Sequence, residues 1–246
     1  METDNPTSSA DWTDGIDLST DNWLLQAQWK ARACDDLNRC TFRLAECMNA
    51  LATLSPSLTE WYWNDQHVPI SESILKEWLS RNWDSEGPHG QLGTTLSLWN
   101  GVKDDQGIAS FSVTCGSTTD TFQPGFDFKP PVPAAWPGLY RVDAMLQVFE
   151  ILLSAWEPAW SRIQPLSLDD ASEGEMINAL ASWIIYLEPD VYSQTGTLPE
   201  EVQVVDSTNG RGSFFILAPT PEQIHLSTVE RLRECLVFPE DWALLR

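Results

Sequence analysis

The stretch SLWNGVKDDQGIASFSV, residues 97–113, predicts a β-hairpin with an acidic tip. Apolar residues alternate with polar ones on both sides of the tip, over 92–99 and 108–115, as in strands with one buried face. The tip carries Asp104, Asp105 and Gly107, but it lacks the oxygen ligand at every second position and the final glutamate of a calcium loop. We therefore interpret it as a turn that joins two antiparallel strands.

Similar patterns elsewhere in the chain indicate the fold class. VQVVDSTNGRGSFFIL contains Asn209-Gly210, a preferred turn of tight hairpins. WYWND and residues 122–128 predict further strands. Because hairpin connections outnumber strand–helix–strand crossovers, the predicted fold is α+β, a mostly antiparallel sheet built from hairpins with several amphipathic helices packed on it.

Helical periodicity predicts one long N-terminal helix before the sheet. Apolar residues recur at steps of three and four until Ser55-Pro56, where proline disfavours further helix. The same spacing predicts helices over 139–156 and 172–187. We expect a single domain over 1–246, with an acidic flexible N-terminus at 1–21, the long helix at 22–54, an α+β core at 60–217 and a C-terminal helix at 220–236.

Acidic residues dominate the charge of the chain. It has 36 Asp and Glu against 14 Lys and Arg, a formal net charge of −22, and no Lys or Arg lies between Arg162 and Arg211. Phosphate binding needs clustered Lys and Arg, so the composition disfavours nucleic acid as a direct partner and favours a basic protein. Solubility alone, or a saline habitat, is the alternative explanation of the charge.

The sequence carries no signal for a membrane or for export. No apolar run reaches the length of a membrane span, and residues 1–10 lack the basic and then apolar pattern of a signal peptide. We therefore expect a cytoplasmic protein without a membrane partner.

Residues that usually carry chemistry form no motif. His67, His89 and His225 are far apart, and the five cysteines show no metal-ligand spacing. We therefore expect no catalytic residue, no metal site and no cofactor. The 13 tryptophans leave an alternative open, because rings such as Trp156 and Trp160 either fill the core or stack on a sugar. A carbohydrate-binding or carbohydrate-acting domain is therefore the rival function.

Four segments together resemble the immunity protein 52 family of bacterial polymorphic toxin systems: WYWND, SLWNG…GIASFSV, LLSAWEPAW, and ASWIIYL with the short hairpin after it. The resemblance covers residues 60–217. It implies a cytoplasmic antitoxin, without catalytic residues, whose partner is a nuclease toxin of the restriction-endonuclease type delivered by contact-dependent or type VI secretion. The aromatic positions that match the family pattern, and that we expect to be structural, are Trp63, Trp99, Trp156, Trp160 and Trp183.

Charge and resemblance together predict that a basic nuclease toxin binds acidic residues in loops flanking the sheet. The candidate toxin-binding residues are Asp104, Asp105, Asp169, Asp170, Glu173 and Glu175. Inhibition by covering the toxin's active site and inhibition at an exosite both fit this prediction. An effector adaptor or chaperone is a related alternative, and the sequence leaves the oligomeric state open.

Overall fold

The fold is built on one large antiparallel sheet. The computed structural model describes residues 17–30, 35–81, 83, 93–118, 124–167 and 180–238. Ten strands of these residues form the sheet, in the order β10-β11-β8-β7-β1-β6-β5-β4-β2-β3, and the pairs along it are antiparallel. This confirms the predicted α+β class. The strands are β1 (Trp23–Gln28), β2 (Tyr62–Trp63), β3 (Gln66–His67), β4 (Thr94–Trp99), β5 (Ser110–Cys115), β6 (Gly125–Lys129), β7 (Trp160–Pro165), β8 (Ile184–Leu187), β10 (Gln203–Asp206) and β11 (Ser213–Ile216), with a separate pair of β9 (Ser193–Gln194) and β12 (Leu236–Val237).

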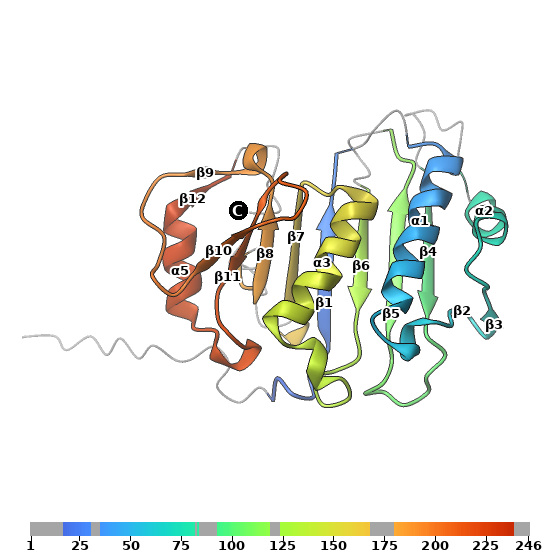
Figure 1. Ribbon diagram of the computed structural model, residues 1–246, viewed down its shortest axis with the longest axis horizontal. Coiled ribbons are helices and arrows are strands. Elements are labelled where there is room, and N and C mark those ends of the chain that lie inside the picture. The colour runs from blue at the N-terminus through green and yellow to red at the C-terminus, as the bar shows by residue number, and fades with distance from the viewer. Residues whose placement is uncertain are drawn as a thin grey trace, which may run out of the picture.

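Two helices, α1 and α3, lie on one face of the sheet (Figure 1). The carboxylate of Asp36 caps α1 by accepting the backbone N–H of Arg39 at 2.8 Å. None of the helices that the structure describes has both the length and the apolar content needed to cross a membrane. The described α-helices are α1 (Leu37–Ala52), α2 (Glu72–Ser80), α3 (Val142–Trp156) and α5 (Leu226–Cys235), and short 3₁₀ helices lie at Pro56–Leu58, Pro137–Leu139, Pro189–Val191 and Pro221–Gln223.

The two faces of the sheet differ in polarity. Leu98, Phe111 and Phe128 lie opposite one another on β4, β5 and β6, and each is at most 2% exposed. On the other face of the same strands, the hydroxyls of Ser97 and Ser112 lie 2.8 Å apart. This alternation has the period of two that the hairpin sequences predicted.

Both predicted hairpins are confirmed. β4 pairs with β5 on either side of the acidic tip, and β10 pairs with β11. Gly210 at the second turn has a φ of 67°, in the left-handed region that glycine adopts without cost. The third predicted strand, over 122–128, corresponds to β6.

The predicted long helix over 22–54 is wrong, since the first helix begins at Leu37. Trp23–Gln28 instead form β1, in the middle of the sheet between β6 and β7. Trp23 and Leu25 are completely buried and alternate with half-buried neighbours. Pairing on both edges satisfies the backbone groups of this segment while it buries a tryptophan. The helical spacing that predicted the helix lies in residues 33–54, whereas Trp23, Leu25 and Ala27 alternate with a period of two, as in a strand.

The predicted helix over 172–187 is wrong at its end, where Ile184–Leu187 form β8. All four residues are buried, and a short continuous apolar run does not distinguish a buried strand from a buried helix. Residues 168–179 lie outside the described residues. The C-terminal helix predicted over 220–236 divides into the 3₁₀ helix at Pro221–Gln223 and α5.

The predicted flexible segment 1–21 falls largely outside the described residues, which begin at residue 17. Its last residues form a turn. The carboxylate of Asp17 accepts the backbone N–H of Ser19 at 3.1 Å and the Ser19 hydroxyl at 2.6 Å.

Candidate functional site

The tip of the β4–β5 hairpin is organised by a buried amide. Asn100 is 6% exposed, its Nδ2 donates to the Gly107 carbonyl at 3.0 Å, and its Oδ1 accepts the backbone N–H of Ala109 at 3.0 Å. Both candidate residues at the apex, Asp104 and Asp105, are exposed. The structure therefore places these two carboxylates on the surface of a loop whose base Asn100 holds.

The other predicted binding residues, Asp169, Asp170, Glu173 and Glu175, lie outside the described residues. Further exposed acids surround the sheet in the described part of the chain, and they form no ion pair with a described lysine or arginine. These acids are Glu46, Glu60, Asp65, Glu72, Asp190, Glu200, Glu222, Glu230 and Glu234.

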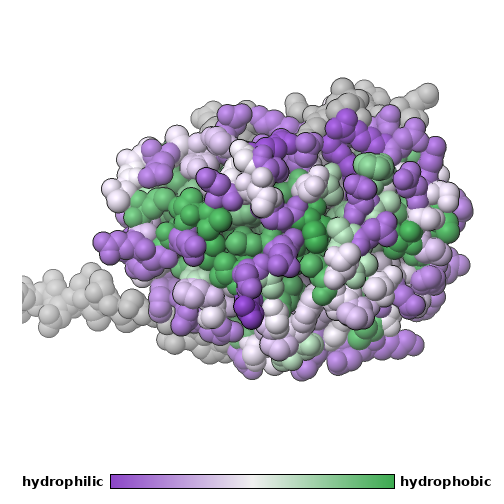
Figure 2. Space-filling view, in the orientation of Figure 1, coloured by the Kyte–Doolittle hydropathy of each residue, from purple (hydrophilic) through white to green (hydrophobic). Residues whose placement is uncertain are grey.

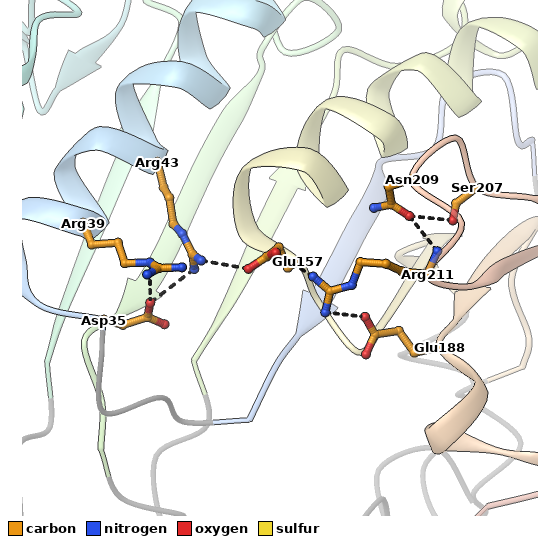
Figure 3. A network of polar contacts seen from close by, with 8 residues as sticks. All are labelled: Asp35, Arg39, Arg43, Glu157, Glu188, Ser207, Asn209 and Arg211. Carbon is orange, nitrogen blue, oxygen red and sulfur yellow. Dashed lines mark hydrogen bonds and ion pairs between the residues drawn. The ribbon is translucent and has the colours of Figure 1, made fainter.

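Arginines near the middle of the molecule are engaged by acids of the same fold (Figure 3). The Arg43 side chain is 8% exposed and lies 3.2 Å from Asp35 and 2.9 Å from Glu157. Glu157 also contacts Arg211 at 2.6 Å, and Arg211 contacts Glu188 at 2.9 Å. This alternating chain of charges joins α1, the end of α3 and the β10–β11 hairpin.

Arginines nearer the surface also have acidic partners. Arg141 donates from Nε and Nη2 to the two carboxylate oxygens of Asp143, at 3.1 and 3.0 Å. Further pairs join Arg39 to Asp35, Arg81 to Glu77 and Arg231 to Glu201. Exposed Lys76, Lys103 and Arg233 form no ion pair with a described acid, but the exposed acids without an ion pair are more numerous, so acids dominate the charge that the described surface presents.

An apolar groove of about 660 Å³ lies between α3 and the β10–β11 edge of the sheet. Val142 and Leu146 of α3 form one wall, and Val205, Ile216 and Ala218 supply further apolar lining. Figure 2 shows apolar side chains gathered over this end of the molecule, beside α3 and over β10, β11 and α5. Contiguous apolar surface of this kind marks an interaction site in a soluble protein.

The lining of the groove also contains charged groups. Asp143 and Glu201 line it together with Arg141. The hydrogen bond from Arg231 lowers the pKa of Glu201, so this carboxylate stays ionised at neutral pH. Farther along α3, Glu150 accepts the backbone N–H of Thr208 at 2.8 Å.

Three of the predicted structural tryptophans are core residues. Trp156, Trp160 and Trp183 are 1%, 3% and 0% exposed. Trp156 stacks on Trp29 with ring centroids 5.3 Å apart, and the indole N–H of Trp183 donates to the Ala218 carbonyl at 2.9 Å. No sugar can stack on these rings unless the core opens.

The other two aromatic positions lie nearer the surface, at the β2–β3 end of the sheet. Trp99 is half-buried, and its indole N–H donates to the Asn64 carbonyl at 2.6 Å. Trp63 is 38% exposed and packs against Trp78 with centroids 5.0 Å apart. The guanidinium carbon of Arg81 lies 3.9 Å from the Trp78 ring centroid, so this cation covers one face of that ring.

The described residues contain no candidate metal centre, and of their four free cysteines only Cys235 is half-buried rather than buried. No group of three or more His, Cys, Asp or Glu side chains there is placed to hold a metal ion. Cys40, Cys47 and Cys115 are buried. Burial raises the pKa of the Cys47 thiol to about 12, so the thiol remains protonated at neutral pH.

Sequence reasoning missed both Asn100 and the groove. Asparagine is common in turns, so nothing in the sequence shows that the side chain of Asn100 forms hydrogen bonds with Gly107 and Ala109. The groove combines residues of α3, β10 and β11, and their proximity depends on the strand order. The alternation along β10 was the available signal, since it puts Gln203 and Val205 on one face.

Comparisons with known proteins do not show a family for this chain. No protein-family model matches it, and no curated protein matches it. Among solved structures it is similar to the T6SS protein PA0821 of Pseudomonas aeruginosa, with a TM-score of 0.49 and 15% identity, over 87% of this chain and 71% of that one. A similarity at this level is too low to transfer fold or function.

Proposed function

We propose that this chain is a bacterial immunity protein that binds and neutralises a basic, secreted nuclease toxin. The observation that carries the proposal is its charge. The net charge is −22, six arginines of the described residues pair with acids of the same fold, and the exposed acids without an ion pair outnumber the exposed cations without one. A nuclease must present Lys and Arg to phosphates, and an acidic protein can occupy or cover that surface.

The resemblance of residues 60–217 to the immunity protein 52 family supplies the class of toxin in this proposal. Asp104 and Asp105 are the predicted binding residues that the structure describes, and both are exposed on a loop at the edge of the fold. Binding residues on such a loop are held by the sheet behind them.

The carbohydrate alternative has less support. Its expected stacking platform consists of Trp156, Trp160 and Trp183, which are buried. The exposed Trp63 packs against Trp78, and Arg81 covers one face of Trp78. An accessible aromatic platform would have to be built from other rings.

Co-expression tests the proposal. The proposal predicts a gene for a toxin with a nuclease domain beside the gene of this chain. That nuclease domain is expressed in a bacterial host with this protein, with an empty vector, or with an unrelated acidic protein. Immunity predicts survival only with this protein. It also predicts that the purified protein inhibits DNA cleavage at equimolar amounts.

Two other results would redirect the assignment. An adaptor or chaperone would bind the nuclease domain but leave its DNA cleavage intact. A protein that neither binds the nuclease domain nor protects the cell would contradict the proposed function.

A further inference from the structure

We infer that the apolar groove between α3 and β10 docks an amphipathic helix of the partner, with an apolar stripe in the groove and basic residues on its flanks. This inference rests on the proposed function and identifies the part of the toxin that the protein holds. It concerns a surface distinct from the acidic tip at Asp104 and Asp105, which lies in the hairpin of β4 and β5.

The layer of helices stops before the edge of the sheet. A helix is about 10 Å wide, and neighbouring strands are about 4.8 Å apart, so one helix covers roughly two strands. Phe149 of α3 reaches β11, where its ring lies 5.6 Å from that of Phe214. Beyond this contact, Val205 on β10 remains only half-buried. The groove beside α3 lies at this edge, and α5 is near it, since Arg231 of α5 pairs with Glu201 of the lining (Figure 1).

The lining of the groove matches an apolar stripe. Val142 and Leu146 are one helical turn apart on α3 and are half-buried, as is Val205. Removing such surface from water favours docking. A helix with apolar residues three and four positions apart would cover both walls at once, as in other complexes where a helix fills a groove.

Charge selects the occupant. Arg141, Asp143 and Glu201 line the groove, and the two acids are paired with Arg141 and Arg231, so the lining itself carries little net charge. The negative charge beside the groove comes from acids outside its lining. Glu150 lies on α3 one turn beyond Leu146, Glu200 precedes Glu201, and Glu222 follows Thr220 by two residues. A second copy of this chain would bring another net charge of −22 to the contact, so repulsion disfavours it and a basic helix is favoured.

Two adjacent valines of β10 provide a matched test. Val205 pairs with Phe214 and lines the groove, whereas Val204 pairs with Phe215, lies on the other face and is 44% exposed. Val205→Lys puts a cation into the groove, and Val204→Lys makes the same change one residue away. Binding of the nuclease domain encoded beside this gene is measured by calorimetry, together with the thermal midpoint of each variant. We expect Val205→Lys to weaken binding at least about tenfold, and Val204→Lys to change it less than about twofold.

A milder variant keeps the test valid if Val205→Lys unfolds. Gln203 lines the groove but is exposed, so Gln203→Arg adds a positive charge without disturbing the core. We expect it to weaken binding by about threefold or more. A synthetic amphipathic helix of leucine and lysine, about four turns long, gives an independent readout by fluorescence anisotropy. It should bind the wild-type protein more tightly than a scrambled version or a leucine–glutamate version, and Val205→Lys should weaken its binding.

Three results would overturn the inference. The first is unchanged toxin affinity in folded Val205→Lys and Gln203→Arg, which leaves the proposed function standing. The second is equal binding of the scrambled peptide. The third is that the wild-type protein is a dimer, that Val205→Lys makes it a monomer, and that toxin binding is unchanged. The groove would then be the contact between two copies of this chain. Failure of the wild-type protein to bind the nuclease domain at all would instead contradict the proposed function.

Discussion

Asn100 shows how one side chain sets the shape of the acidic tip. Asn100→Ala removes the two hydrogen bonds that the Asn100 side chain makes to the Gly107 carbonyl and the Ala109 N–H. Ala109 is fully buried, and the alanine side chain offers its N–H no acceptor. An unsatisfied buried group costs about 1–3 kcal/mol, so we expect the free energy of unfolding to fall by about 2 kcal/mol. Urea unfolding followed by tryptophan fluorescence measures it.

Asp104→Ala is the control for this prediction, because it lies in the same loop and is exposed. It should change the free energy of unfolding by less than about 0.5 kcal/mol. Equal effects of the two substitutions would show that Asn100 does not hold the loop.

Glu157 combines an unusual backbone with two ion pairs. It ends α3 with a φ of 49° and a ψ of 54°, and its carboxylate contacts Arg43 and Arg211. Glu157→Ala and Glu157→Gly both lose the carboxylate, but only glycine adopts this conformation without steric cost. We expect the glycine variant to be about 1 kcal/mol more stable than the alanine variant, and both to be less stable than the wild type. Urea unfolding of all three proteins tests this order, and equal stability of the two variants would contradict the strain argument.

The β10–β11 hairpin carries one side of the groove, and its turn depends on Gly210. A methyl group at Gly210 or at Gly138 would meet no atom within 4 Å, but only Gly210 has a positive φ, of 67°. Gly210→Ala should therefore lower the free energy of unfolding by about 1 kcal/mol. Gly138→Ala should leave it unchanged or raise it slightly. Thermal unfolding of both variants tests the difference, and matching losses would mean that the backbone conformation of the turn is not the cause.

Turn residues and alternation within one short segment predicted the hairpins. The strands that were missed depend on contacts between segments far apart in the chain. The Asn209-Gly210 turn and the alternation beside it are contained in one short segment, and β10–β11 forms as predicted. β1 was missed because its partners, β6 and β7, lie far along the chain, and because the helical spacing of residues 33–54 was extended over it. The alternation of Trp23, Leu25 and Ala27 was a local signal for a strand. β8 was missed because a fully buried strand has no alternation.

The candidate site follows the same division between local and distant contacts. The exposure of Asp104 and Asp105 could be predicted, since both lie at the tip of a predicted hairpin. The role of Asn100 could not be predicted, because it depends on hydrogen bonds across the loop. The groove could not be predicted either, because its residues come together only when the order of the strands in the sheet is known.

For the whole molecule, charge and ion pairing act together. Arg43 and Arg211 join α1, α3 and the β10–β11 hairpin through shared acids, so these cations stabilise the fold and add little positive potential outside it. The acids that remain exposed set the external field. The field of a protein with a net charge of −22 attracts a basic partner before contact and repels another copy of itself.

This field predicts a strong salt dependence of toxin association. Raising the ionic strength from about 0.1 M to about 1 M shortens the Debye length from about 10 Å to about 3 Å. The association rate constant should therefore fall at least about tenfold, with a smaller change in the dissociation rate, because screening acts mainly on the encounter. Stopped-flow fluorescence measures both rates. An association rate that does not respond to salt would remove the electrostatic basis of the proposed function.

The position of the acids should matter as well as their number. Asp104→Lys with Asp105→Lys reverses two charges at the tip, and Glu230→Lys with Glu234→Lys reverses two exposed charges on α5. Both double variants have the same net charge. If the tip faces the toxin, the first should slow association more than the second, by about threefold or more at low salt, since steering depends on the field near the contact. Equal losses would mean that the toxin responds to the total charge of the protein and that the acidic tip faces water in the complex.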